Sequence, residues 1–142
     1  MRHLKARGKL SRTSSHRRCL FANMLKSLIE HGRIETTLAK AKILRSYADR
    51  MVTLAKKNTL ASRRNAIAEL MIRFNTLTPE QLRAAKKGET TGQNGDRQVI
   101  KILFEDLGPR FSTRPGGYTR IIKTGQRVGD GGQKCVIEYL PA

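Results

Sequence analysis

A short basic segment from residue 109 to residue 120 combines arginines, glycines and two aromatic residues. Arginine forms charge-assisted hydrogen bonds to phosphate groups. Paired glycines let backbone N–H groups approach a nucleic-acid strand closely, because they carry no side chain. This composition predicts contacts with a phosphate backbone from Arg110, Arg114, Gly116, Gly117 and Arg120.

The two aromatic residues of this segment, Phe111 and Tyr118, have two alternative interpretations. Either ring could stack on an unpaired nucleic-acid base, so Tyr118 is included among the candidate contacts. Aromatic residues more commonly pack in the core beneath a turn. The sequence leaves both alternatives open, and the contacts expected of the arginines do not depend on the choice.

A second basic segment lies at the N-terminus. Residues 1–18 contain no acidic residue, and Leu4 and Leu10 are their sizeable apolar side chains after Met1. Such a segment buries too little apolar area to offset about 1 to 2 kcal/mol of conformational entropy per residue. We therefore predict a solvated arm over residues 1–18, ordered by phosphates, before a single globular domain over residues 19–142. The predicted nucleic-acid contacts of the arm are Arg2, His3, Lys5, Arg7, Lys9, Arg12, Ser14, His16, Arg17 and Arg18.

The charge of the whole chain supports a polyanionic partner. It has 29 Lys and Arg against 11 Asp and Glu, a formal net charge of +18. This balance favours nucleic acid first and an anionic membrane second. No apolar stretch approaches the roughly 18 residues of a membrane span, so no membrane partner is expected. An organelle transit peptide is a further alternative for the basic, Ser-containing residues 1–29.

Residues able to carry catalysis or bind a metal are few. His16 follows Ser14 and Ser15, but sequence neighbours do not form a catalytic triad. His16 and Cys19 have a plausible spacing for two metal ligands, yet no second pair follows at the spacing of a zinc site. We therefore predict no catalytic residue, metal, cofactor or small-molecule substrate. Cys19 and Cys135 are expected to be small buried side chains in a reducing compartment, without a bridge.

Periodicity predicts the elements that position these segments. We expect helices over residues 14–31, 37–57, 59–74, 78–87 and 99–107, and strands over residues 33–37, 118–123 and 134–140. Gly108 and Pro109 are expected to end the last helix. The inward face of the third helix is predicted to consist of Leu60, Ile67, Leu70, Met71 and Phe74. The fold class that follows is α+β, with helices packed on a small three-stranded sheet.

The type of nucleic acid is indicated by what the helices lack. A protein that reads DNA sequence is expected to contain a helix-turn-helix, a zinc finger or a basic zipper. The junctions between these helices show none of the three. A basic arm with Gly-rich loops better suits a folded RNA contacted through its shape and phosphates. The main alternative is a non-specific DNA-compacting protein, and a more distant one is a small hydrolase acting on RNA.

Several characteristic blocks of sequence follow one another in a specific order along nearly the whole chain. They cover residues 1–3, 8–10, 12–17, 33–42, 53–56 and 107–121. Together they resemble the bacterial large-subunit ribosomal protein seventeen family. The resemblance implies a non-enzymatic constituent of the large ribosomal subunit in the cytoplasm, with the ribosome of an organelle as the alternative location. Its implied partners are large-subunit ribosomal RNA and neighbouring ribosomal proteins, with the basic extension reaching into the RNA. Because the match begins at Met1, we expect the arm to be part of the working protein.

Two departures from the family pattern lie outside the two basic segments. Residues 75–96 look like an insertion between two helices, which we expect to be a surface excursion. Ala39 stands where the family often has proline. The sequence does not reveal a role for the insertion.

Overall fold

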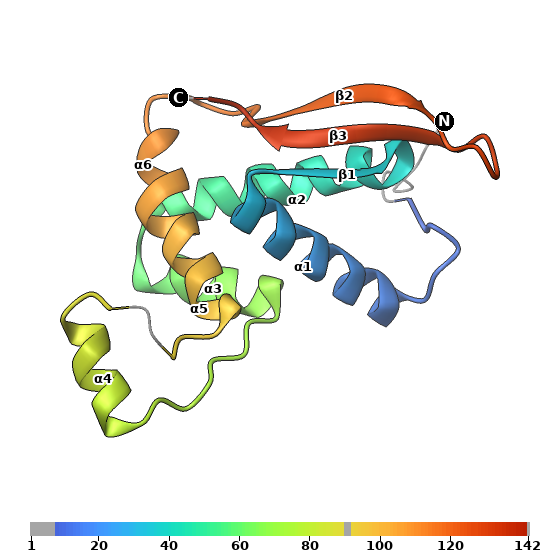
Figure 1. Cartoon of the computed structure of the whole chain (residues 1–142). Helices are drawn as coiled ribbons and strands as arrows, with labels where there is room; N and C mark the ends of the chain where they lie inside the picture. Colours follow the sequence, from blue (N-terminus) through green and yellow to red (C-terminus); the bar gives the residue numbers. More distant parts are fainter. Residues whose placement is uncertain (1–7, 90–91, 142) are drawn as a thin grey trace.

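The computed structural model describes residues 8–89 and 92–141. Helices pack against a three-stranded antiparallel sheet (Figure 1), which confirms the predicted α+β class. In chain order the elements are α1 (Ser14–His31), β1 (Arg33–Thr37), α2 (Leu38–Lys57), α3 (Leu60–Leu70), α4 (Pro79–Lys86), α5 (Gly95–Lys101), the π-helical segment η1 (Ile102–Leu107), α6 (Gly108–Arg110), β2 (Thr119–Gln126) and β3 (Gln133–Tyr139).

The sheet has the strand order β1-β3-β2, so β3 pairs with both other strands. Alternation along β3 buries Cys135, Ile137 and Tyr139, because successive side chains of a strand point to opposite faces. Ile34 of β1 and Ile121 of β2 both pair with Ile137. All three predicted strands are present, and β2 extends beyond its predicted end to Gln126.

Helices α1 and α2 supply most of the remaining core. α2 lies beneath the sheet in Figure 1, and its buried residues are Ala41, Leu44, Ala48, Met51, Val52 and Ala55. Thr13 is the N-cap of α1, so the helix begins at the predicted residue 14. The helix ends as predicted at Gly32, whose φ of 73° is a left-handed conformation that glycine adopts without strain.

The predicted inward face of the third helix is largely wrong. α3 ends at Leu70, and Leu60 and Phe74 are 66% and 46% exposed. A capping box between Thr59 and Ser62 fixes the start of the helix. The face at i, i+4 and i+8 from Ser62 is buried instead, and it consists of Ser62, Ala66 and Leu70. Small residues on this face let α3 approach its neighbours closely.

The predicted end of the last helix is also wrong. Gly108 and Pro109 lie inside a continuous helical segment that reaches Arg110. The backbone N–H of Gly108 donates to the carbonyl of Leu103, the wider π-helical spacing. Gly108 is required by packing, because a Cβ there would lie 3.2 Å from the carbonyl oxygen of Ala55 on α2. Pro109 lies at the second residue of α6, directly after the π-helical segment.

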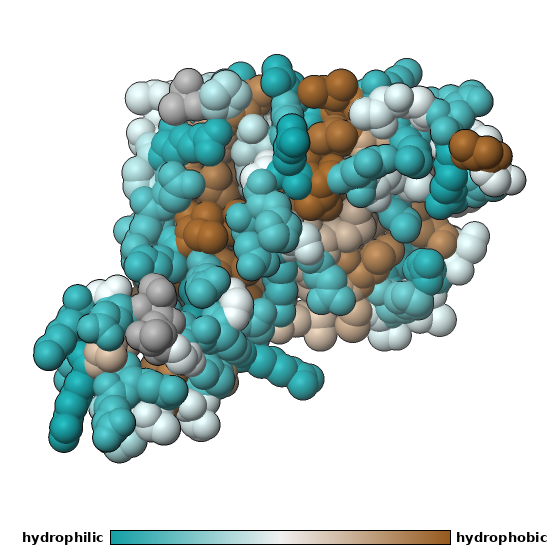
Figure 2. Space-filling model, viewed as in Figure 1, coloured by the Kyte–Doolittle hydropathy of each residue, from teal (hydrophilic) through white to brown (hydrophobic). Residues whose placement is uncertain are grey.

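The segment around α4 extends away from the other helices in Figure 1. The predicted cap at Thr78 is confirmed, with Gln81 completing a capping box, and α4 has no buried residue. Hydrophilic residues cover most of this region in Figure 2. Its base is held by Asn75, which donates to the carbonyl of Gly92 at 2.7 Å and accepts from Arg97 Nε at 3.2 Å.

A carboxylate joins this base to α1. Asp96 pairs with Lys26 of α1 at 2.8 Å and accepts a hydrogen bond from the backbone N–H of Arg73 at 2.7 Å. Partial burial raises the pKa of Asp96, but the contacts with Lys26 and Arg73 outweigh it, so the pKa is lowered. The carboxylate therefore stays ionised, and the pair formed, at neutral pH.

The two cysteines differ in environment, and both are free. Cys135 is buried as predicted, and burial raises the pKa of its thiol. Cys19 is exposed, so the prediction of a buried side chain is wrong at this position. Its place on α1 lies outside the buried face formed by Phe21, Leu25 and Leu28.

We predict that Asp49→Ala lowers the free energy of unfolding by about 1 to 3 kcal/mol, the cost of leaving buried donors unsatisfied. The carboxylate of Asp49 on α2 accepts from the backbone N–H of Tyr118 at 3.2 Å and from the hydroxyl of Thr119 at 3.3 Å. Urea denaturation measures the change. Asp106→Ala is the control, because it removes the same charge from an exposed site. Equal effects of the two substitutions would contradict the role given to Asp49.

Candidate nucleic-acid interface

The predicted contacts of the arm divide into two groups. Arg2, His3, Lys5 and Arg7 lie outside the described residues. The other predicted contacts of the arm lie just before α1 or in its first turns. Lys9, Arg12, Ser14, His16 and Arg18 are exposed, and Arg17 is half-buried.

Hydrogen bonds hold several guanidinium groups in place at and just before the first turns of α1. Arg12 lies 3.0 Å from His16 Nε2, and Arg17 donates to the carbonyl of Arg12 at 2.9 Å. Arg18 donates to the carbonyl of Ala68 on α3 at 3.4 Å. A guanidinium has five N–H donors, so each group keeps donors for a further anion.

The ion pairs among residues 8–89 and 92–141 leave these cations without a carboxylate partner. The pairs are Lys26–Asp96, Arg50–Glu69, Arg120–Glu138, Arg127–Asp130 and Lys134–Glu35. None involves the cations at the start of α1. The positive charge at this end of the molecule is therefore not neutralised by those pairs.

The basic segment of residues 109–120, the second of the two along the chain, begins within α6, and α2 holds its backbone in position. Lys56 of α2 donates to the carbonyl of Arg114 at 2.6 Å and to the hydroxyl of Tyr118 at 3.3 Å. The sequence places Lys56 mostly off the apolar face of α2, and this anchoring role was not predicted. A lysine placed near an apolar helix face is a weak signal, because its flexible stem can reach many partners.

The arginines of the second segment have different surroundings. Arg114 is exposed. Arg110 is half-buried, with its Nη2 2.5 Å from the carbonyl oxygen of Leu140 and its guanidinium over the ring of Phe111. Arg120 pairs with Glu138 of β3 at 2.5 Å. Arg114 and Arg120 are thus both exposed, but of these two Arg120 has the carboxylate partner, and Arg110 also ties α6 to the C-terminal end of β3.

The glycines of this segment face solvent. Gly116 and Gly117 are exposed, and a Cβ at either would meet no atom within 4 Å. Gly117 has a φ of 63°, so its backbone conformation favours glycine. The exposed backbone here meets the geometric requirement for close approach of a strand.

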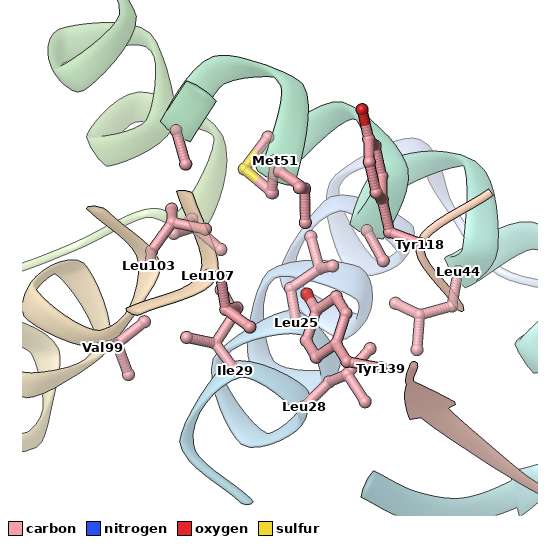
Figure 3. Close-up of a cluster of buried hydrophobic side chains, with 14 of the residues drawn as sticks. Leu25, Leu28, Ile29, Leu44, Met51, Val99, Leu103, Leu107, Tyr118 and Tyr139 are labelled. Atoms are coloured by element: carbon pink, nitrogen blue, oxygen red, sulfur yellow. The ribbon is translucent and has the colours of Figure 1, made fainter. Parts of the chain in front are cut away.

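The aromatic residues of the segment pack in the core. Phe111 is 1% and Tyr118 2% exposed, and their ring centroids lie 5.2 Å apart. Figure 3 draws Tyr118 in the same cluster as Leu25, Leu28 and Leu44. The interpretation of both residues as core residues is therefore correct, and neither ring is open to stack on a base.

The two basic segments lie at separate ends of the molecule. In Figure 1 the chain enters α1 far from α6 and the start of β2. The predicted residues therefore form two surfaces instead of one enclosed cleft. No group of three or more His, Cys, Asp or Glu among the described residues could hold a metal ion. None of the helices described is both long and apolar enough to cross a membrane.

Comparison with known proteins assigns the chain to a family. The family model described as ribosomal protein L17 matches residues 20–140. The chain belongs to the ribosomal protein L17 family. This confirms the resemblance inferred from the sequence blocks. The matched range covers every strand and most of α1.

Full-length relatives extend the match through the arm. The chain is 69% identical over 140 residues to the large ribosomal subunit protein bL17 of Protochlamydia amoebophila. It is 59% identical to the protein of the same name from Chlamydia trachomatis serovar L2 and 58% identical to that of Chlamydia pneumoniae. Each alignment covers 99% of both chains. The similarity to these L17 proteins is therefore not limited to the globular part.

We predict that Tyr118→Ala lowers the free energy of unfolding by about 3 to 5 kcal/mol, as expected for truncation of a core aromatic residue. Thermal or urea unfolding without RNA measures the loss. Arg114→Ala, at an exposed position four residues earlier, is the control and should change stability by less than about 0.5 kcal/mol. A similarly small effect of Tyr118→Ala would show that the ring is not part of the core.

Proposed function

We propose that this chain is a structural constituent of the large ribosomal subunit that binds large-subunit ribosomal RNA through its arm and its segment from Arg110 to Arg120. Membership of the ribosomal protein L17 family supports the place in the subunit. The arrangement of cations supports RNA as the direct partner. Neighbouring large-subunit proteins are further partners, and the ribosome in the cytoplasm is the location.

The observation that carries the proposal is the presence of two separate cationic surfaces on one domain. The start of α1 carries arginines without carboxylate partners among the described residues, and Arg114 is exposed on the second surface. A small-molecule substrate would require cations that converge on one cleft. Cations spread over two ends fit an extended polyanion, whose phosphates repeat along its length.

Each residue of the second surface has a specific role in this proposal. Arg114 binds phosphate directly, because its side chain is exposed. Arg120 exchanges or shares its contact with Glu138 when a phosphate approaches. Gly116 and Gly117 let the strand come close to the backbone. Tyr118 acts from within the core, where it supports the carbonyl of Arg114 through its hydroxyl.

The arm requires a test that leaves α1 intact, because residues 14–18 belong to that helix. We predict that deletion of residues 2–9 lowers the salt dependence of ribosomal RNA binding by up to about 3 units in the log-log slope, since each lost phosphate contact removes about 0.7 to 0.9 unit. The dissociation constant is measured by filter binding from 50 to 300 mM KCl.

A charge-matched variant separates the arm from net charge alone. Replacement of Lys40, Lys57, Arg64 and Lys101 by glutamine removes the same number of cations from positions on α2, α3 and α5. We expect this variant to retain a steeper slope than the truncated chain. Equal slopes would mean that general charge, and not the arm, accounts for the binding.

Competition between nucleic acids tests the proposed function against DNA compaction. We predict that large-subunit ribosomal RNA displaces the protein from duplex DNA at matched salt and phosphate concentration, because a folded RNA presents phosphates at many angles to two separated surfaces. The readout is fluorescence anisotropy of labelled DNA. Equal affinity for the two nucleic acids would favour a non-specific DNA-compacting protein.

A further inference from the structure

A hollow of about 390 Å³ lies between α1, α2 and α3, apart from the segment that follows α6. Gly8, which belongs to the arm, forms part of the wall of this hollow. Ligand pockets in proteins usually measure about 300 to 1,000 Å³, so this one is at the small end of the range. Its volume suits a single planar group, not a helix or a strand.

Two stacked aromatic rings line the hollow. Phe21 of α1 and Tyr47 of α2 have ring centroids 5.2 Å apart and an interplanar angle of 20°. Phe21 is buried, whereas Tyr47 is half-buried and reaches the surface of the hollow. Aromatic rings in such positions stack nucleic-acid bases without regard to sequence, because every base has a π-face.

Three arginines and one carboxylate also line the hollow, and they are Arg17, Arg18, Arg50 and Glu69. Arg50 pairs with Glu69 at 2.6 Å, so the acidic group is already neutralised. Arg17 and Arg18 each have one nitrogen bound to a backbone carbonyl. Both therefore remain as held cations with free N–H donors beside the aromatic wall.

We propose that this hollow binds one unstacked nucleotide of the ribosomal RNA, with its base against Tyr47 and its phosphate on Arg17 and Arg18. The inference rests on the proposed function and locates one specific contact within it. A nucleotide carries a planar ring and an adjacent negative charge in the same unit. These two groups match the aromatic wall and the guanidinium groups of Arg17 and Arg18, which line the same hollow.

Gly8 of the arm lies against the wall of the hollow. A Cβ on Gly8 would lie 2.6 Å from Cδ1 of Ile43 on α2, so the chain passes in close contact with the wall. RNA phosphates bound by the arm are thus led to the edge of the hollow. A strand that follows the arm can turn one base into it without leaving the basic surface.

The first test removes the aromatic ring without changing charge. Tyr47→Leu should weaken binding to large-subunit ribosomal RNA transcribed in vitro by about 5-fold to 150-fold, the equivalent of one base stack. The salt slope should stay unchanged, because no cation is lost. Tyr47→Phe keeps the ring and should bind within twofold of the original chain, which also controls for the packing against Phe21.

Two comparisons make this test decisive. Arg45→Gln removes an exposed cation of α2 that does not line the hollow. Any loss in the affinity of this variant for the RNA should be accompanied by a decrease in the salt slope. A loss below fivefold for Tyr47→Leu, or an equal loss for Tyr47→Phe, overturns the nucleotide site. Failure of the original chain to bind the RNA at all would instead overturn the proposed function.

A second test identifies the occupant even if Tyr47→Leu does not fold. Ala68 is exposed and lines the hollow, and it can be replaced by photo-reactive p-benzoylphenylalanine in protein assembled into large subunits. Irradiation should give a covalent adduct between the protein and ribosomal RNA, and ribonuclease should shorten the RNA part of this adduct. An adduct to a neighbouring protein or to residues 1–7 of the same chain, or no adduct, overturns the proposal.

Discussion

Repulsion among 29 basic side chains, opposed by 11 acidic ones, is the constraint under which this chain folds. Several of the few carboxylates lie at joints between elements. Four of the described ion pairs connect different segments, namely Lys26–Asp96, Arg50–Glu69, Arg120–Glu138 and Lys134–Glu35. The fold thus uses its acidic residues to hold elements together and leaves the arm and the segment after α6 positively charged.

Helix α2 gives this charged molecule a common support. One side of α2 is buried beneath the sheet, and its polar residues reach outward to fix neighbouring segments. Asp49 and Lys56 hold the backbone at Tyr118 and Arg114, whereas Arg50 and Tyr47 line the hollow beside α1. The position of the segment after α6 therefore depends on contacts from a single long helix, which also forms one wall of the hollow beside α1.

The sequence predicts elements well where local signals and the core agree. Gly32 ends α1 because its left-handed conformation stops the helix at the point where the chain must turn into β1. Prediction fails where packing overrides the local signal. Gly108 resembles a terminator, yet it lies within a helix because α2 passes too close for a side chain. The apolar residues Leu60 and Phe74 suggest a buried face, but Leu60 is the first residue of α3 and Phe74 lies beyond its end, so the buried face consists of Ser62, Ala66 and Leu70.

The same distinction applies to the candidate interface. Exposure of Arg114 follows from its polar, turn-rich context, whereas the placement of Arg110 against Leu140 depends on a long-range contact that no local pattern reveals. The hollow beside α1 requires three helices to meet, so its aromatic and basic residues are dispersed in the sequence. Arginine stays charged throughout the physiological range. The attraction of the arginines on these surfaces for a polyanion is therefore governed by ionic strength.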